Sequence, residues 1–215
     1  MKKVLFLIFI LFMGTNVFAF DCDSASQCTI LGKKLIDQKE YKSALECFDN
    51  AISMDEDDEF AYAFRARAKF YLKDYEGAVS DAEKSLEIRK NSIAYNARAN
   101  VKFINGDYQG AIDDLTSAVE LNPKYMQCYE MRAFANVKLG NYVEALEDAG
   151  KSIKLNHEYS KNYEVKARAE MGLKDYRSAS RDFLIASRMY KEDGDRKNSR
   201  NMQNLAKTCK RKIKW

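Results

Sequence analysis

The residue types that carry out most enzyme chemistry are scarce in this sequence. His157 is the only histidine, and the pattern places no nucleophile beside it, as a Ser-His-Asp or Cys-His system requires. The sequence has no glycine-rich phosphate loop, no H-E-x-x-H motif and no Cys-x-x-Cys motif. The acidic run Asp55–Glu59 lacks the spacing of a calcium hand and indicates a polar turn. We therefore expect a protein that is not an enzyme, with no catalytic residue, no cofactor and no metal ligand.

Five cysteines suggest redox chemistry, but they do not form a metal-binding pattern. Their number is odd and their spacings match no zinc site. In an oxidising compartment we expect one disulfide among Cys22, Cys28 and Cys47. The alternative is that Cys47 and Cys128 are simply small, buried, apolar residues.

The first residues have the features of an export signal. Two lysines precede ten apolar residues, 4–13, a run too short to cross a bilayer as a helix, which needs about 20 residues. Small residues at Val17-Phe18-Ala19 indicate cleavage after Ala19, which makes residues 1–19 a signal peptide. An uncleaved anchor is the alternative. We expect an exported protein, periplasmic in a bacterium or secreted.

Composition and charge narrow the fold and the class of partner. Nine glycines and one proline in 215 residues, of which 46% are hydrophobic, indicate an almost wholly helical chain. The formal net charge of +4 is unevenly spread, because residues 188–215 hold ten basic and three acidic side chains. Residues 20–187 are therefore net acidic, and a uniformly basic surface for nucleic acid is excluded.

One pattern repeats five times along the chain. A Tyr-x-x-Ala motif recurs with its alanines 34, 33, 34 and 34 residues apart, and a small residue stands twelve positions before each alanine. Short polar turns interrupt each unit once, which predicts two helices per unit. A unit of this size cannot bury its own apolar stripe, so neighbouring units must stack. The motif alanines are Ala44, Ala78, Ala111, Ala145 and Ala179.

This pattern resembles the tetratricopeptide repeat, a 34-residue helix-turn-helix unit. The resemblance implies an all-α, right-handed superhelical solenoid of about five units, closed by a C-terminal capping helix. Only the third unit keeps the proline that ends the family's motif, as Pro123. We place a short N-terminal segment at 20–24, the repeat array at 25–193 and the basic capping helix at 194–215. The five repeats are expected at 25–58, 59–91, 92–125, 126–159 and 160–193.

A basic and an acidic residue recur together in the last four repeats. The basic residue directly precedes the small residue of the first helix, and the acidic residue stands three positions after the motif alanine. In an antiparallel helix pair these positions should face each other, so we predict structural ion pairs. The predicted pairs are Arg65 with Asp81, Arg98 with Asp114, Arg132 with Asp148, and Lys166 with Asp182.

The resemblance also implies a binding surface, because the first helix of each tetratricopeptide unit lines a concave groove that holds peptides or helices. Asparagine side chains there can clamp a peptide backbone, since each offers a donor and an acceptor. The side chains that a chaperone-tail binder uses are not found in register. Phe70 and Phe103 have an alternative place in the core between repeats. The expected groove residues are Lys33, Arg67, Phe70, Asn96, Asn100, Phe103, Glu130, Phe134 and Arg168.

The C-terminal segment 196–214 spaces its apolar residues as an amphipathic helix does. It ends in a cationic cluster closed by a tryptophan, which suits weak contact with an anionic membrane. The alternative is a solvated capping helix. We expect a non-enzymatic scaffold or adaptor that binds a protein or peptide and no nucleic acid, or else a peripheral membrane protein held by this tail. The residues of the cluster are Lys210, Arg211, Lys212, Lys214 and Trp215.

Overall fold

The structure is a computed structural model that describes residues 22–213, and all of its regular structure there is helical. The expected signal peptide 1–19 and the tail residues Lys214 and Trp215 lie outside the described residues. The helices are α1 (Ala25–Asp37), α2 (Tyr41–Met54), α3 (Glu59–Tyr71), α4 (Tyr75–Ile88), α5 (Ser92–Ile104), α6 (Tyr108–Leu121), α7 (Met126–Leu139), α8 (Tyr142–Leu155), α9 (Ser160–Gly172), α10 (Tyr176–Glu192) and α11 (Arg196–Ile213).

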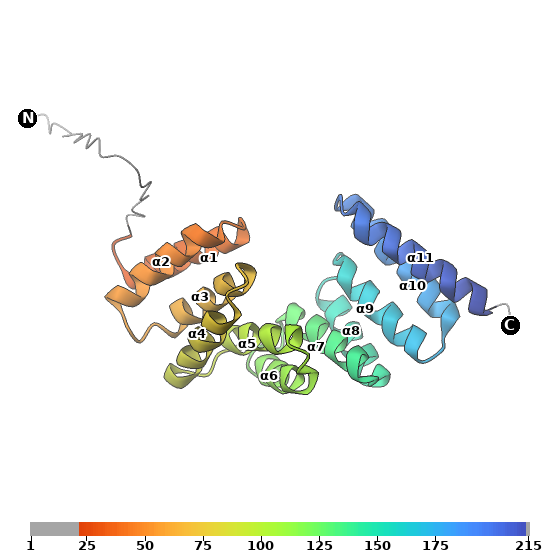
Figure 1. Ribbon diagram of the computed structural model, residues 1–215, viewed down its shortest axis with the longest axis horizontal. Coiled ribbons are helices and arrows are strands. Elements are labelled where there is room, and N and C mark those ends of the chain that lie inside the picture. Colours follow the sequence, from red (N-terminus) through yellow and green to blue (C-terminus); the bar gives the residue numbers. More distant parts are fainter. Residues whose placement is uncertain (1–21, 214–215) are drawn as a thin grey trace, which may run out of the picture.

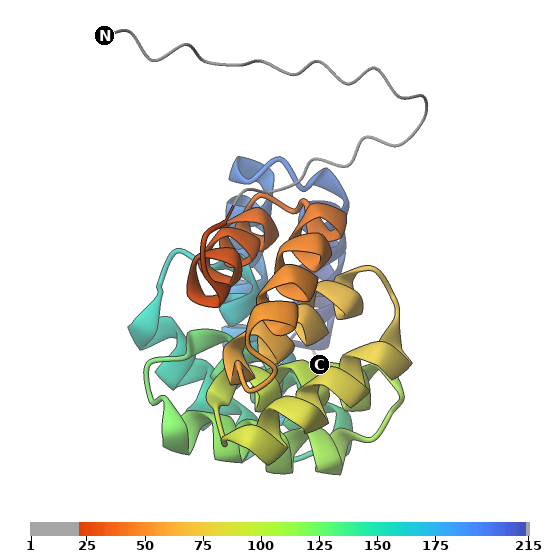
Figure 2. The ribbon, with the colours of Figure 1, turned by 90° about the vertical axis from the view of Figure 1, so that its left-hand side faces the viewer.

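Successive helix pairs stack into an arc. In Figure 1 α1 and α2 form one end, α10 and α11 form the other, and α5 to α7 lie at the bottom of the arc. Figure 2 looks along the array from the α1–α2 end. Each helix packs mainly against its neighbours in sequence, and each first helix of a pair also touches the first helix of the next pair. The predicted all-α solenoid is therefore confirmed.

The repeated small residues lie where helices approach most closely. The five motif alanines are fully buried, as are Ala66, Ala99, Ala133 and Ala167 of the first helices. At Gly32 even a Cβ atom would come within 2.5 Å of the Phe48 ring, so only glycine fits there. The wider gaps are filled by Phe48, Leu115 and Phe183, which are also fully buried. The core is thus a row of small clusters along the array rather than one centre.

Aspartates begin several second helices. The Asp74 and Asp107 side chains each accept a hydrogen bond of 2.9 Å from the backbone N–H three residues later. Such N-caps satisfy a donor that the helix itself leaves unpaired. In the turn just before each cap, one residue has a left-handed backbone, with φ of 67° at Lys73 and 83° at Gly106. Lysine carries a Cβ that makes this conformation costly, whereas glycine does not.

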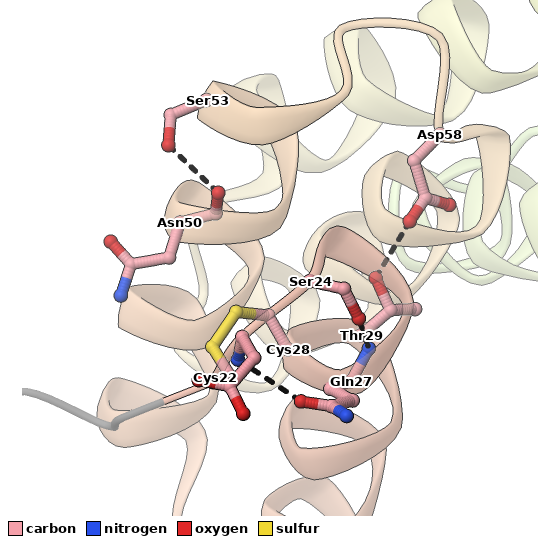
Figure 3. Close-up of a disulfide and its surroundings, with 9 residues drawn as sticks. Cys22, Ser24, Gln27, Cys28, Thr29, Asn50, Ser53 and Asp58 are labelled. Carbon is pink, nitrogen blue, oxygen red and sulfur yellow. Dashed lines mark hydrogen bonds between the residues drawn. A yellow bond between two sulfur atoms is a disulfide. The ribbon is translucent and has the colours of Figure 1, made fainter.

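The N-terminal end of the array is closed by a disulfide between Cys22 and Cys28, whose Cα atoms are 5.4 Å apart. Figure 3 shows it beside the start of α1, where the Thr29 hydroxyl donates a 2.8 Å hydrogen bond to Asp58. The disulfide expected among the first three cysteines therefore uses Cys22 and Cys28. Cys47 is a free, buried thiol, and burial raises its pKa to about 11. It is a packing residue rather than a reactive one.

The structure brings each predicted ion pair together across its helix pair. The Arg65 guanidinium donates from Nε and Nη2 to the two Asp81 oxygens at 2.8 and 2.7 Å. Arg98 and Asp114 repeat this two-point geometry at 2.9 and 2.7 Å. Arg132 and Asp148 do so at 2.7 and 2.8 Å, and Lys166 Nζ donates to Asp182. All four aspartates are buried.

The arginines also reach back to the preceding helix pair, Arg65 and Arg132 by 16 residues and Arg98 by 15. Arg65 Nη1 donates to Asp49 at 2.7 Å, and Arg132 Nη1 donates to the Thr116 hydroxyl at 2.9 Å. Arg98 Nη1 lies 3.9 Å from Glu83. Each arginine therefore ties its own helix pair to the one before it. We call these linked contacts the arginine ladder.

The fifth repeat departs from the ladder. Gly150 stands where a back-reaching acceptor would be, and Lys166 replaces arginine. In the second and third repeats a further lysine pairs with the same aspartate, as Lys69 does with Asp81 at 2.7 Å. The fifth repeat has buried Glu170 at that position, and its Oε2 has no hydrogen-bond partner among the described residues. Burial and the nearby charge of Asp182 raise the pKa of Glu170.

Replacing Lys73 by glycine should increase the free energy of unfolding by about 1 kcal/mol, because it relieves the left-handed backbone strain. The reverse change at the same turn position, Gly106→Lys, should decrease it by a similar amount. A Cβ at Gly106 meets nothing within 4 Å, so only the backbone is tested. Urea unfolding measures the free energy of unfolding of both variants. If both substitutions changed it in the same direction, backbone strain would not be the explanation.

Replacing Arg132 by alanine should cost about 3 kcal/mol of stability, because Asp148 would be left buried without a counter-charge. The matched control is Arg181→Ala, whose side chain is 66% exposed although it also contacts an aspartate, Asp182. That variant should lose less than about 0.5 kcal/mol. Thermal and urea unfolding of both variants test the ladder, and equal losses would show that burial of the pair is irrelevant.

Candidate functional site

The inner side of the arc carries three cavities lined largely by the first helix of each pair. The central cavity, about 340 Å³, lies between α3, α5, α7 and α9. A second cavity of about 450 Å³ adjoins it toward α10 and α11, and we call it the C-terminal cavity. The N-terminal cavity, about 540 Å³, lies beside α1 and the α2–α3 turn. Glu130, Met131 and Lys161 line both of the first two cavities, which therefore form one continuous groove.

The nine groove residues expected from the sequence fall in these cavities. The largest group meets in the central cavity, to which three successive repeats and the start of a fourth contribute side chains. Arg67, Phe70, Asn96, Asn100 and Glu130 line the central cavity; Phe103, Glu130, Phe134 and Arg168 line the C-terminal cavity; Lys33 lines the N-terminal cavity.

Two cations in the central cavity are available to a ligand. Neither Arg67 nor Lys161 takes part in an ion pair within the described part of the chain, although both lie in the cavity wall. Burial alone would lower the pKa of Lys161, but the charge of Glu130 and the neighbouring Tyr159 raise it overall. The Lys161 side chain therefore remains charged at neutral pH.

Glu130 is the least expected charge in the groove. It is only 5% exposed, and its carboxylate forms no hydrogen bond or ion pair with another described residue. Burial raises its pKa to about 7, against the lowering effect of Lys161 and with a further rise from Glu164. A carboxylate held so close to its titration point changes the charge of the groove near neutral pH.

Other groove residues already form hydrogen bonds with neighbouring side chains. Asn96 is buried, and it accepts hydrogen bonds of 3.3 Å from Tyr125 and from Asn100. Arg168 donates to Glu164 at 2.8 and 3.0 Å, and that carboxylate also accepts from Tyr190 at 2.6 Å. Arg168 and Asn96 thus shape the groove more than they offer bonds to a ligand.

The aromatic residues have both of the roles that the sequence left open. Phe70 packs against Tyr75 with ring centroids 5.8 Å apart, and Phe103 packs against Tyr108 at 5.2 Å. Both phenylalanines also line cavities, since they are only half-buried. They support the turns of their helix pairs and present one edge to the groove.

Several groove residues escaped the sequence analysis. Tyr125 and Tyr159 precede α7 and α9 and close the central cavity from the inter-repeat turns. Burial raises the pKa of Tyr125 to about 12. The two tyrosines are 34 residues apart, one repeat period, and that spacing was the signal available. Tyr71, Lys161 and Tyr190 carried no such signal.

The remaining candidates do not form a chemical centre. His157 is exposed in the α8–α9 turn, beside Glu158 and away from the cavities. Over residues 22–213, no cluster of histidine, cysteine, aspartate and glutamate could hold a metal ion. None of the described helices has the length and apolar composition to cross a bilayer. Lys210, Arg211 and Lys212 are exposed on the last turns of α11, outside the groove.

Comparison with known proteins agrees with this architecture. Residues 61–92 and 96–161 match two family models of the tetratricopeptide repeat. The STIP1 homolog of Dictyostelium discoideum is 34% identical over 58 residues, which are 27% of this chain and 10% of that protein. This chain therefore spans only a small part of the length of that relative.

Two solved structures share the fold over most of their length. TTC0263, a tetratricopeptide protein of Thermus thermophilus, superposes with a TM-score of 0.67 at 17% identity, over 85% of this chain and 98% of its own. YrrB, a tetratricopeptide protein with an unusual peptide-binding site, superposes with a TM-score of 0.52 at 18% identity, over 86% of both chains. Residues 61–92 and 96–161 are therefore tetratricopeptide repeats, and the chain as described folds as an all-helical solenoid of tetratricopeptide type.

Proposed function

We propose that this protein is a scaffold or adaptor that binds an extended segment of a partner protein along the inner groove of its arc. Tetratricopeptide-repeat proteins typically mediate protein–protein interaction, which supports this class of function. The peptide-binding site of YrrB, on a similar fold, supports a peptide-like ligand. The leader in the sequence adds the proposal that binding takes place after export, in the periplasm or outside the cell.

The central cavity is the observation that carries the proposal. It gathers the unpaired cations Arg67 and Lys161, the amide of Asn100 and the ring edge of Phe70 around one opening. A peptide offers backbone groups to the amide, acidic groups to the cations and side chains to the ring. Because the cavity is part of a continuous groove, the segment can extend from it toward Phe103 and Phe134.

A catalytic function has less support. The buried aspartates of the arginine ladder are held in two-point ion pairs between helices. The residues that line the central and C-terminal cavities include no serine, threonine, cysteine or histidine. Selective binding of a partner on a preformed surface accounts for the groove without any chemical step.

The double variant Arg67→Ala/Asn100→Ala should weaken partner binding by at least about tenfold, because it removes one cation and one amide from the cavity. The matched control is Lys84→Ala/Asn50→Ala, which removes the same two kinds of side chain, a cation and an amide, from exposed positions on outer helices. Affinity capture from envelope and secreted fractions identifies the partner, and titration calorimetry with the captured protein measures both variants.

A partner lost by the groove variant and kept by the control would establish the groove as the binding surface. If capture survives the groove change but requires α11, the groove assignment is wrong. Circular dichroism verifies that both variants remain folded.

Replacing Glu130 by glutamine should stabilise the protein at pH 8 by roughly 2–3 kcal/mol. A pKa raised to about 7 means that the folded state holds its proton more tightly than the unfolded state. The contribution of the Glu130 side chain to the free energy of unfolding is therefore fully present below pH 4.5 and is lost as the pH rises through 7. Urea unfolding at pH 4 should show no gain, and the exposed control Glu158→Gln should show none at either pH.

A further inference from the structure

A further hollow lies between α10 and α11, and none of its lining residues lines the three inner cavities. Its lining includes the apolar residues Leu184, Ile185 and Ile213, and it measures about 410 Å³. Leu184 and Ile213 are 41% and 42% exposed, which is high for side chains of this size. We call this hollow, with its four-cation rim of Arg177, Arg181, Arg188 and Lys210, the cationic groove.

The rim holds no acidic side chain. Arg181 contacts Asp182, but that carboxylate is buried in the ladder and is already paired with Lys166. The equivalent hollow between α4 and α5 has the opposite character, because its rim carries Glu76 and Glu83. The hollow between the second helix of a pair and the next helix is thus acidic at α4–α5 and basic at α10–α11.

The whole chain follows this gradient. Residues 25–121 hold 13 basic and 18 acidic side chains, a net charge of −5. Residues 176–213 hold 11 basic and 4 acidic side chains, a net charge of +7. In Figure 1 the acidic region covers α1 to α6, from one end of the arc to its bottom, and the basic region covers α10 and α11 at the other end. An isolated molecule is therefore strongly polarised along its length.

The acidic end presents a segment that matches the cationic groove. The α2–α3 turn exposes Asp55, Glu56 and Asp57, and it is flanked by Met54 and Phe60, which are 54% and 38% exposed. We call residues 54–60 the acidic loop. It combines two large apolar side chains with three exposed carboxylates, which match the apolar and basic residues that line the cationic groove.

The acidic loop is fixed in position by its own hydrogen bonds. Asp58 caps α3 by accepting from the backbone N–H groups of Phe60 and Ala61, at 3.0 and 2.9 Å. It also accepts the Thr29 hydroxyl hydrogen bond drawn in Figure 3. Because the loop is held this way, presenting it to a partner costs little conformational entropy.

We propose that copies of this protein associate head to tail, with the acidic loop of one molecule seated in the cationic groove of the next. The apolar flanks of the loop cover Leu184 and Ile213, and its carboxylates meet the arginines of the rim. Because the two surfaces differ, each molecule in such a contact leaves one loop and one groove open, and the assembly extends as a chain. The acidic loop borders the N-terminal cavity, whereas the central and C-terminal cavities contain none of its residues and stay free to bind a partner.

An anionic membrane is the rival occupant of the cationic groove. The hollow is lined by apolar side chains as well as by four cations, so it suits a segment that carries both apolar and acidic side chains. Charge complementarity between the two ends of the same chain therefore favours a second copy. The contact is small and depends on exposed charges, so it should be weak and sensitive to salt.

Sedimentation velocity over micromolar to millimolar concentrations tests the proposal on residues 20–215. The average mass should rise with concentration at low salt and fall back toward the monomer as salt increases. The groove variant Arg181→Glu/Arg188→Glu and the loop variant Glu56→Lys/Asp57→Lys should each weaken association by about tenfold or more. The matched control is Lys197→Glu/Arg200→Glu, which makes the same change in net charge as the groove variant but at exposed positions of α11 outside the cationic groove. It should associate like the wild type.

Mixing the groove and loop variants supplies the sharpest readout, because each reversed surface then meets a complementary one. Association should return in the mixture, an outcome that loss of folding cannot imitate. A wild type that stays monomeric throughout the concentration range, or association that the groove variant leaves unchanged, would overturn the proposal. Binding of the wild type but not of the groove variant to phosphatidylserine vesicles, without self-association, would assign the groove to a membrane instead.

Discussion

Close approach between helices is the constraint on which the rest of this structure depends. Alanine, glycine or serine occupies each position where two helices meet, and these residues are fully buried or nearly so. At such short separations a guanidinium on one helix reaches both oxygens of a carboxylate on the next, as Arg98 reaches Asp114. The same closeness leaves no room for larger side chains, as the ring of Phe48 against Gly32 illustrates. The short distance between helices therefore sets both the size of the residues that can pack there and the geometry of the ion pairs.

The arginine ladder gives this packing a direction. Arg65 and Arg132 each bind forward by 16 residues within a helix pair and back by 16 residues to the previous pair. A buried pair of this kind contributes less to net stability than to a defined geometry, because its desolvation cost offsets much of its attraction. A repeat array needs such a device, since similar units could otherwise slide past one another. The fifth pair lacks it and instead packs a longer α10 against α11, burying Met202 and Cys209.

Most of the fold was predictable, because the same pattern of small and aromatic residues recurs five times with a period of about 34 residues. The ladder pairs were accessible from covariation within the sequence itself, since Arg65 and Asp81 belong to the same repeat. The backward contact to Asp49 was not, because it depends on how one helix pair is set against another. The groove was predictable in outline by resemblance, whereas Lys161 and Tyr190 enter it from positions that only the stacking angle brings inward. The cationic groove needed the structure as well, since Arg177 and Lys210 come together only when α11 folds back on α10.

The distribution of charge separates two surfaces that a single chain can use at once. Inside the arc both signs of charge are present, since Glu130 lines the central cavity together with Arg67 and Lys161. Such a surface selects a ligand by the position of its groups rather than by its overall charge. Toward the two ends of the array, charges of one sign predominate, which favours long-range attraction and tolerates imprecise contact. A weak, salt-sensitive contact at the ends can therefore place several copies of a selective groove along one assembly, and multivalency raises the effective affinity for a partner that spans them.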